Sequence, residues 1–117
     1  MQAYESLAAR DCAPCKKGTP PLAGTALEKL SDALGHGWEV PDGKRLEKKF
    51  AFQDFRQALD FTNRIGAVAE AQDHHPDIAL SWGKVGVTLW THTVNGLSEN
   101  DFILAAKVES LPRPAAG

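Results

Sequence analysis

Three of the four histidines in this chain lie within one stretch, residues 70–101, and two of them are adjacent. His74 and His75 are followed at once by Pro76, and His92 comes seventeen positions after His75. Imidazole titrates near neutral pH, so one such ring can donate a proton while another accepts one. The stretch therefore predicts either metal-free acid–base catalysis or a histidine-rich metal centre.

The adjacent pair lies where a long helix is predicted to end, because Pro76 cannot continue a helix. Neighbouring side chains normally point apart, so a junction is one of the few places where both rings could face one cavity. A cationic ring could instead cap the helix C-terminus, where the helix dipole favours positive charge. That alternative readily explains one of the two histidines but not both.

A metal centre would combine the three imidazoles with Glu70 or Asp73. Glu70 and His74 are four residues apart and would share one face of the helix. Against a metal, adjacent histidines rarely chelate one ion with good geometry, and no H-E-x-x-H motif is present. The chain also lacks a G-x-S-x-G elbow and a glycine-rich phosphate loop. Metal-free acid–base chemistry is therefore the favoured prediction.

Cys12 and Cys15 form a single C-x-x-C pair. A structural zinc site would need two more ligands, and the chain has no second pair of cysteines. The following residues, KKGTPP, are unlike the helix start that follows a thioredoxin-type redox motif. We expect reduced thiols in a loop, with a shared metal or a redox role as the alternatives.

Composition excludes several classes of protein. Hydrophobic residues make up 43% of the chain and charged residues 24%, as in ordinary globular domains. A formal net charge of −2 gives no electrostatic reason to expect nucleic acid or an anionic membrane as partner. The apolar runs are too short to span a bilayer, and the N-terminal residues contain no apolar signal core. These features predict a cytoplasmic protein.

Hydrophobic periodicity and turn signals predict the element order αββαββα. The helices are expected at about residues 26–34, 54–73 and 99–111, and the strands at 36–40, 44–52, 78–82 and 85–92. This order predicts an α+β fold with a four-stranded antiparallel sheet and helices packed on one face. Residues 1–24 are expected to be an extended lead-in, 25–112 a single domain, and 113–117 a frayed tail. The apolar arc of the longest helix is wide enough to support association with another copy.

The histidine stretch resembles a known family. Its pattern, Glu70-x3-His74-His75-Pro76-x5-Trp82-x9-His92-x8-Asp101, is similar in residues and spacing to the signature of the pterin-4a-carbinolamine dehydratases. The lead-in resembles bacterial members, which often carry a C-x-x-C pair followed by a G-x-P-P-L segment. This chain has C-A-P-C at 12–15 and G-T-P-P-L at 18–22. The resemblance covers nearly the whole chain.

The resemblance implies a reaction and a set of roles. The reaction is loss of water from a 4a-hydroxytetrahydropterin to give quinonoid dihydropterin, which recycles the cofactor of aromatic amino-acid hydroxylases. His74 and His92 are expected to be the acid–base pair, and His75 mainly a pterin-binding group. No metal or organic cofactor is implied, because the pterin is the substrate. The supporting or substrate-binding residues are expected to be Glu70, Asp73, Pro76, Trp82, Thr91, Thr93 and Asp101.

Two of these supporting residues also have structural explanations. Asp101 is the fourth residue of Ser98-Glu-Asn-Asp, a capping box, so we expect it to cap a helix and to act on catalysis indirectly. Trp82 is expected in the core or in a pocket wall rather than as a stacking platform.

The resemblance also implies assembly as a homodimer or homotetramer, so either is expected here. The alternative function is a non-catalytic module of the same fold that binds, assembles or promotes dimerisation of a partner. Relatives of that kind tend to lose the histidine set, whereas this chain retains all three, which favours the enzyme.

Overall fold

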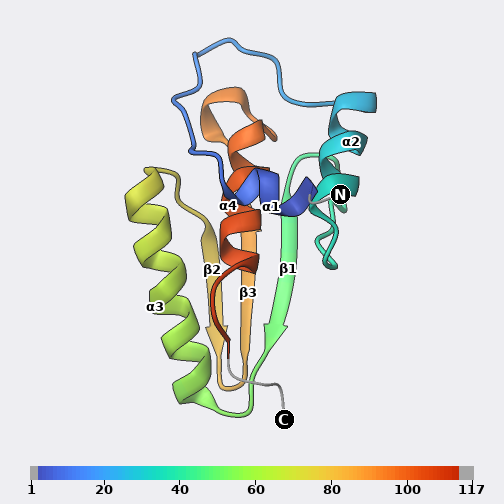
Figure 1. Cartoon of the computed structure of the whole chain (residues 1–117). Helices are drawn as coiled ribbons and strands as arrows, with labels where there is room; N and C mark the ends of the chain where they lie inside the picture. The colour runs from blue at the N-terminus through green and yellow to red at the C-terminus, as the bar shows by residue number, and fades with distance from the viewer. Residues whose placement is uncertain (1–2, 114–117) are drawn as a thin grey trace.

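The computed structural model describes residues 3–113, which form a mixed helical and β-sheet fold (Figure 1). The antiparallel sheet has three strands in the order β1-β3-β2. In chain order the elements are α1 (Ala3–Ala8), α2 (Gly24–Leu34), β1 (Leu46–Ala51), α3 (Phe55–Gln72), β2 (Asp77–Ser81), β3 (Lys84–Leu89), the 3-10 helix η1 (His92–Val94) and α4 (Glu99–Glu109).

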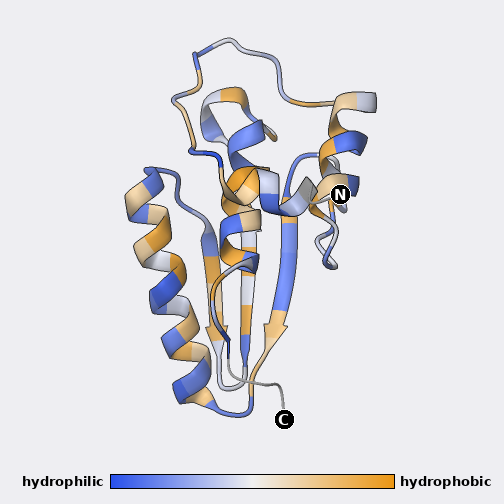
Figure 2. Cartoon of the chain, viewed as in Figure 1, coloured by the Kyte–Doolittle hydropathy of each residue, from blue (hydrophilic) through white to orange (hydrophobic). Residues whose placement is uncertain are grey.

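The helices cover one face of the sheet, because apolar side chains alternate along the strands. Val85, Val87 and Leu89 of β3 are fully or almost fully buried, as are Leu46 and Phe50 of β1. The residues between them point to the other face, where Lys49, Ala51, Ala79 and Ser81 are exposed. Figure 2 shows apolar and hydrophilic residues alternating in bands along α3, which packs its apolar side on the sheet and on α4.

The prediction of a fourth strand at residues 36–40 is wrong. Gly35, His36 and Gly37 all have positive φ angles, of 54°, 57° and 83°, so the chain coils here instead of extending. Only Glu39 pairs with the sheet, through a single bridge to Glu47. Trp38 turns inward and donates its indole N–H to Glu109, at 2.9 Å. A buried aromatic therefore fixes this segment in place of a strand ladder.

The expected extended lead-in also needs correction, because residues 3–8 form the helix α1. Every residue of α4 except Glu99 and Lys107 is buried. Other elements must therefore pack on sides of α4 that do not face the sheet. Figure 1 shows α1 lying across α4, where Leu7 is 4% exposed. Residues 11–16 contain no helix or strand, and residues 114–117 of the predicted tail lie outside the described part of the chain.

Two further predictions about β2 and β3 differ from the structure. The last strand ends at Leu89 rather than at residue 92, because the chain turns into η1 and Thr91 makes only an isolated bridge to Gly96. Trp82 is 69% exposed at the turn between β2 and β3, so it does not lie in the core of the chain. Within residues 3–113, no helix is both long and apolar enough to cross a membrane.

Candidate functional site

The end of α3 sets the position of His74. Asp73 closes the helix in the left-handed conformation, with φ 52° and ψ 41°, and the His74 N–H donates to the Ala69 carbonyl at 3.2 Å. This sharp change of direction before Pro76 carries His74 out of the helix and toward the start of α4. The side chain of His74 is 12% exposed.

Asp101 is the partner of His74. Its Oδ1 lies 2.6 Å from His74 Nε2, and its side chain is fully buried. Oδ2 accepts hydrogen bonds from the Ser98 N–H at 2.9 Å and from the Thr91 hydroxyl at 2.8 Å. The predicted capping box is present, and the same carboxylate that caps α4 also holds the imidazole.

The numbers of donors and acceptors on these side chains fix which group donates in each hydrogen bond of this network. The single Thr91 hydroxyl proton goes to Asp101, so the Ser98 hydroxyl, 2.7 Å away, must donate to Thr91. With Asp101 ionised, His74 Nε2 must carry a proton, and the neutral ring then presents an unprotonated Nδ1. A carboxylate that holds an imidazole in one tautomer leaves the other ring nitrogen able to accept a proton.

A cavity of about 300 Å³ adjoins this histidine. Its volume is at the lower end of the range for small-molecule sites. It is lined by Cys12, Ala13, Pro14, Cys15, Gln72, Asp73, His74, Thr91, Thr93 and Asn100. Four of the predicted site residues, His74, Asp73, Thr91 and Thr93, are therefore brought together, and Asp101 joins them through its hydrogen bonds.

His75 is directed to a different partner. Its Nε2 lies 2.6 Å from Glu70 Oε2, and the two side chains are 55% and 78% exposed. An ion pair this exposed contributes little to stability. Each of the adjacent histidines thus has its own carboxylate, and His75 is not among the residues that line the cavity beside His74.

His92 begins η1 and is exposed. Its ring stacks on Trp90, with centroids 3.8 Å apart and planes at 30°, and the Arg45 guanidinium lies 5.1 Å from the Trp90 ring centre. His92, like Pro76 and Trp82, is not part of the lining of the cavity beside His74. In the described chain, no three His, Cys, Asp or Glu side chains form a group that could hold a metal ion.

Sequence reasoning missed several lining residues, namely Gln72, Asn100 and the segment 12–15. Their side chains have no titratable chemistry of the kind that marks a site, apart from the two thiols. Burial raises the pKa of the Cys12 thiol to about 11, so Cys12 remains neutral near pH 7. The C-x-x-C pair was the only signal that could have pointed to this segment.

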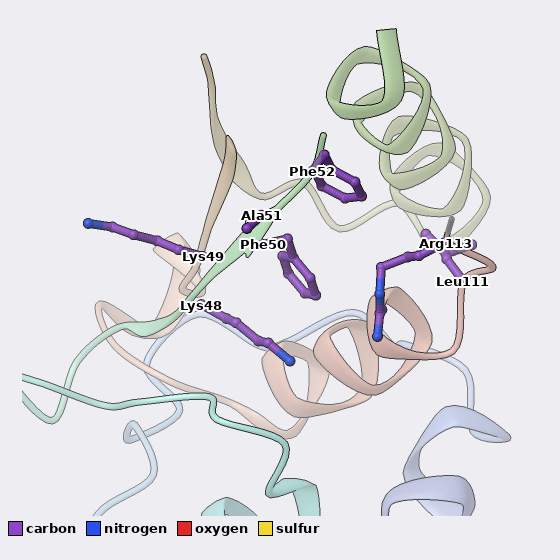
Figure 3. A pocket seen from close by; sticks show the side chains of 7 residues that line it. All are labelled: Lys48, Lys49, Phe50, Ala51, Phe52, Leu111 and Arg113. Atoms are coloured by element: carbon purple, nitrogen blue, oxygen red, sulfur yellow. The ribbon is translucent and has the colours of Figure 1, made fainter. Parts of the chain in front are cut away.

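A second cavity, of about 530 Å³, has no histidine in its lining (Figure 3). It is lined by Lys48, Lys49, Phe50, Ala51, Phe52, Leu111 and Arg113. Lys48 and Arg113 are both committed to the buried carboxylate of Glu109, at 2.7 and 3.1 Å. Although burial pushes it upward, hydrogen bonds from Lys48 and Trp38 and the nearby charges of Lys48 and Arg113 lower the pKa of Glu109. We therefore attribute this network of hydrogen bonds and ion pairs to stabilisation of the fold.

Comparison with known proteins identifies the family. A family model described as pterin 4 alpha carbinolamine dehydratase matches residues 20–111. A protein of Rubrobacter xylanophilus that carries the provisional name pterin-4-alpha-carbinolamine dehydratase is 52% identical over 105 residues, covering 90% of this chain and 97% of that protein.

Two solved structures are similar to the fold. One, from Brucella melitensis, is described as a transcriptional coactivator/pterin dehydratase; it is 34% identical, with a TM-score of 0.71, over 77% of this chain and 96% of that chain. The other is a pterin dehydratase-like protein described as a RuBisCO assembly factor in the alpha-carboxysome, 28% identical with a TM-score of 0.55, over 64% of this chain and 88% of that chain. Together with the matched family model, these relatives show that the chain belongs to the pterin-4-alpha-carbinolamine dehydratase family.

Proposed function

We propose that this protein catalyses the dehydration of a 4a-hydroxytetrahydropterin to quinonoid dihydropterin and water. The observation that carries the proposal is the His74–Asp101 pair, whose imidazole lines a cavity of about 300 Å³. Membership of the family supports the substrate class. Product release would serve the recycling of the pterin cofactor of aromatic amino-acid hydroxylases.

The reaction requires two proton transfers. The 4a-hydroxyl leaves as water, which calls for a proton donor, and the N5 proton is lost, which calls for a base. Electrons only redistribute within the pterin, so the elimination needs neither an oxidant nor an organic cofactor, and we propose that no metal takes part. His74, with Nε2 bound to Asp101, can accept a proton at Nδ1 and become an imidazolium that the buried carboxylate stabilises.

We propose that His92 is the second proton-transfer group and that His75 mainly binds the pterin, as the motif implies. Glu70 would orient His75, since their side chains already form a hydrogen bond of 2.6 Å. Asp73, Thr91 and Thr93 belong to the lining of the cavity and would contact or orient the substrate. Pro76 would act by fixing the backbone between His75 and β2, and a role for Trp82 would require substrate or another subunit at the β2–β3 turn.

We further propose that the protein assembles as a homodimer or homotetramer. Phe55 and Leu59, one turn apart on α3, are 44% and 38% exposed, which is unusual for large apolar side chains on one helix face. β2 is an edge strand of the sheet and could pair with a copy of itself. Both features favour association through α3 and through the sheet edge.

A second candidate function is a non-catalytic role in binding or assembly. The RuBisCO assembly factor of similar fold is the observation that favours it. The two functions are separated by measuring the dehydration of a chemically generated 4a-hydroxytetrahydropterin. The enzyme should exceed the buffer rate, and the double variant His74→Ala/His92→Ala should not; a wild-type rate equal to that of buffer would leave only the binding function.

A further inference from the structure

The cavity beside His74 has one wall from a distant part of the chain. Cys12, Ala13, Pro14 and Cys15 line it, more than fifty residues before the other lining residues. In Figure 1 the segment that follows α1 passes between the end of α3 and the start of α4. The family model matches only from residue 20 onward, so this wall lies outside the part of the chain that defines the family.

Two amide side chains hold the segment in place. The Asn100 side chain pairs with the backbone of Ala13: Oδ1 accepts from the Ala13 N–H at 3.0 Å, and Nδ2 donates to the Ala13 carbonyl at 2.6 Å. Gln72 Oε1 accepts from the Cys12 N–H at 2.7 Å, and Gln72 Nε2 donates to Asp11 at 3.1 Å. A loop satisfied by four such bonds is ordered enough to act as a binding surface.

The anchors are neighbours of the acid–base pair. Gln72 is the last residue of α3, two positions before His74, and Asn100 directly precedes Asp101 in the first turn of α4. The position of the wall is therefore fixed by the same two helix ends that position the imidazole and its carboxylate.

Both thiols lie against Asn100. Cys12 Sγ is 3.6 Å from the Asn100 carbonyl, and Cys15 Sγ is 3.4 Å from Asn100 Nδ2. Because its pKa is raised by burial, Cys12 is a neutral packing group rather than a nucleophile. The wall thus presents small, uncharged surface to the cavity.

We propose that residues 12–15 form a substrate-binding wall that determines affinity and size selectivity for the pterin, with Gln72 and Asn100 as positioning residues. This inference rests on the proposed function. It assigns the C-x-x-C segment a role in binding and separates that role from proton transfer, which belongs to His74.

The test is steady-state dehydration kinetics of the full chain with 4a-hydroxy-6-methyltetrahydropterin. Gln72→Ala and Asn100→Ala should each raise KM by about threefold to tenfold, the loss expected for one or two hydrogen bonds, with kcat within about twofold. The double variant Asp11→Asn/Gln72→Glu reverses donor and acceptor in the hydrogen bond between these two side chains. Because the bond is kept, its KM should equal that of the wild type. Lys17→Ala, next to the wall and exposed, is the control and should not change KM.

A second variant tests the wall directly without loosening it. Ala13→Phe adds bulk to a lining residue whose backbone is what Asn100 binds. It should raise KM more for a pterin with a dihydroxypropyl side chain than for the 6-methyl substrate.

The outcomes separate the two proposals. Wild-type turnover with KM unchanged in Gln72→Ala, Asn100→Ala and Ala13→Phe overturns the wall and leaves the dehydratase intact. A parallel titration with the non-reacting 7,8-dihydropterin should show the same loss of affinity in the variants. A wild-type chain that neither binds this pterin nor accelerates dehydration overturns both proposals.

Discussion

His74 Nε2 lies 2.6 Å from Asp101 Oδ1, and this hydrogen bond joins the end of α3 to the first turn of α4. The Asp101 carboxylate is fully buried and also accepts from the Ser98 N–H and the Thr91 hydroxyl. One carboxylate therefore caps a helix and sets the tautomer of the imidazole. This relationship generates the first prediction.

Asp101→Asn should lower kcat by more than about tenfold and by up to about 10⁴-fold, because the carboxylate both orients the proton-transferring histidine and stabilises its imidazolium. The amide can present an N–H to the ring, which favours the wrong tautomer. The variant should also lose about 1 kcal/mol of unfolding free energy, because the hydrogen bonds from the Ser98 N–H and the Thr91 hydroxyl would end on a neutral amide oxygen instead of a carboxylate. Steady-state kinetics and chemical denaturation measure both effects.

The control is Glu99→Gln, an exposed substitution in the same turn of α4. It should leave kcat unchanged. An unchanged kcat in Asp101→Asn as well would show that the carboxylate only caps the helix.

Glu70→Gln should change the unfolding free energy by less than about 0.5 kcal/mol, because its pair with His75 is exposed to solvent. If His75 binds the pterin in the orientation that Glu70 sets, the same variant should raise KM. Thermal unfolding and kinetics are compared in one preparation. A large loss of stability would contradict the solvent-exposed geometry of the pair.

Glu109→Gln should destabilise the protein at neutral pH by about 3 kcal/mol, because it leaves the partly buried charges of Lys48 and Arg113 without their anion. The folded-state pKa of Glu109 lies below its ordinary value, since hydrogen bonds from Lys48 and Trp38 outweigh the opposing effect of burial. Its stabilising contribution is therefore complete above the ordinary glutamate value, about 4.3, and is lost as pH falls through the folded-state pKa.

Urea denaturation of wild type and Glu109→Gln at pH 7 and at pH 3 measures this difference. The gap between the two proteins should shrink in acid. An equal gap at both pH values would mean that the charge of Glu109 is not the source of the stability.

Phe55→Lys with Leu59→Lys should shift the oligomer toward monomer while the fold is retained, because these side chains are the exposed apolar surface of α3. Light scattering gives the mass, and circular dichroism confirms the fold. Arg56→Gln, exposed on the same helix, is the matched control. A wild-type monomer at micromolar concentration would contradict the proposed assembly.

Local sequence signals predicted the two helix ends that build the site. Pro76 marked the end of the long helix that precedes the histidines, and Asp101 occupies its predicted place in the capping box. Such caps depend on residues three positions apart, so a pattern in the sequence is enough to locate them. The α+β class was likewise predicted from local signals, namely the hydrophobic periodicity and the turn residues.

The features that sequence reasoning missed depend on contacts between distant residues. Trp38 looks like a strand residue, yet its indole bonds to Glu109, seventy-one positions later, and the chain coils to allow it. The wall at residues 12–15 is held by Gln72 and Asn100, whose amides have no distinctive spacing. No local pattern encodes contacts of this kind.

The most direct test of the central claim is the kcat for dehydration by His74→Gln, measured with chemically generated 4a-hydroxy-6-methyltetrahydropterin against the uncatalysed rate in buffer. The substitution keeps a polar side chain beside Asp101 but removes the titratable ring, so kcat should fall by at least about a hundredfold while the unfolding temperature changes little. A variant that retains the wild-type kcat would contradict the assignment of His74 as the acid–base group.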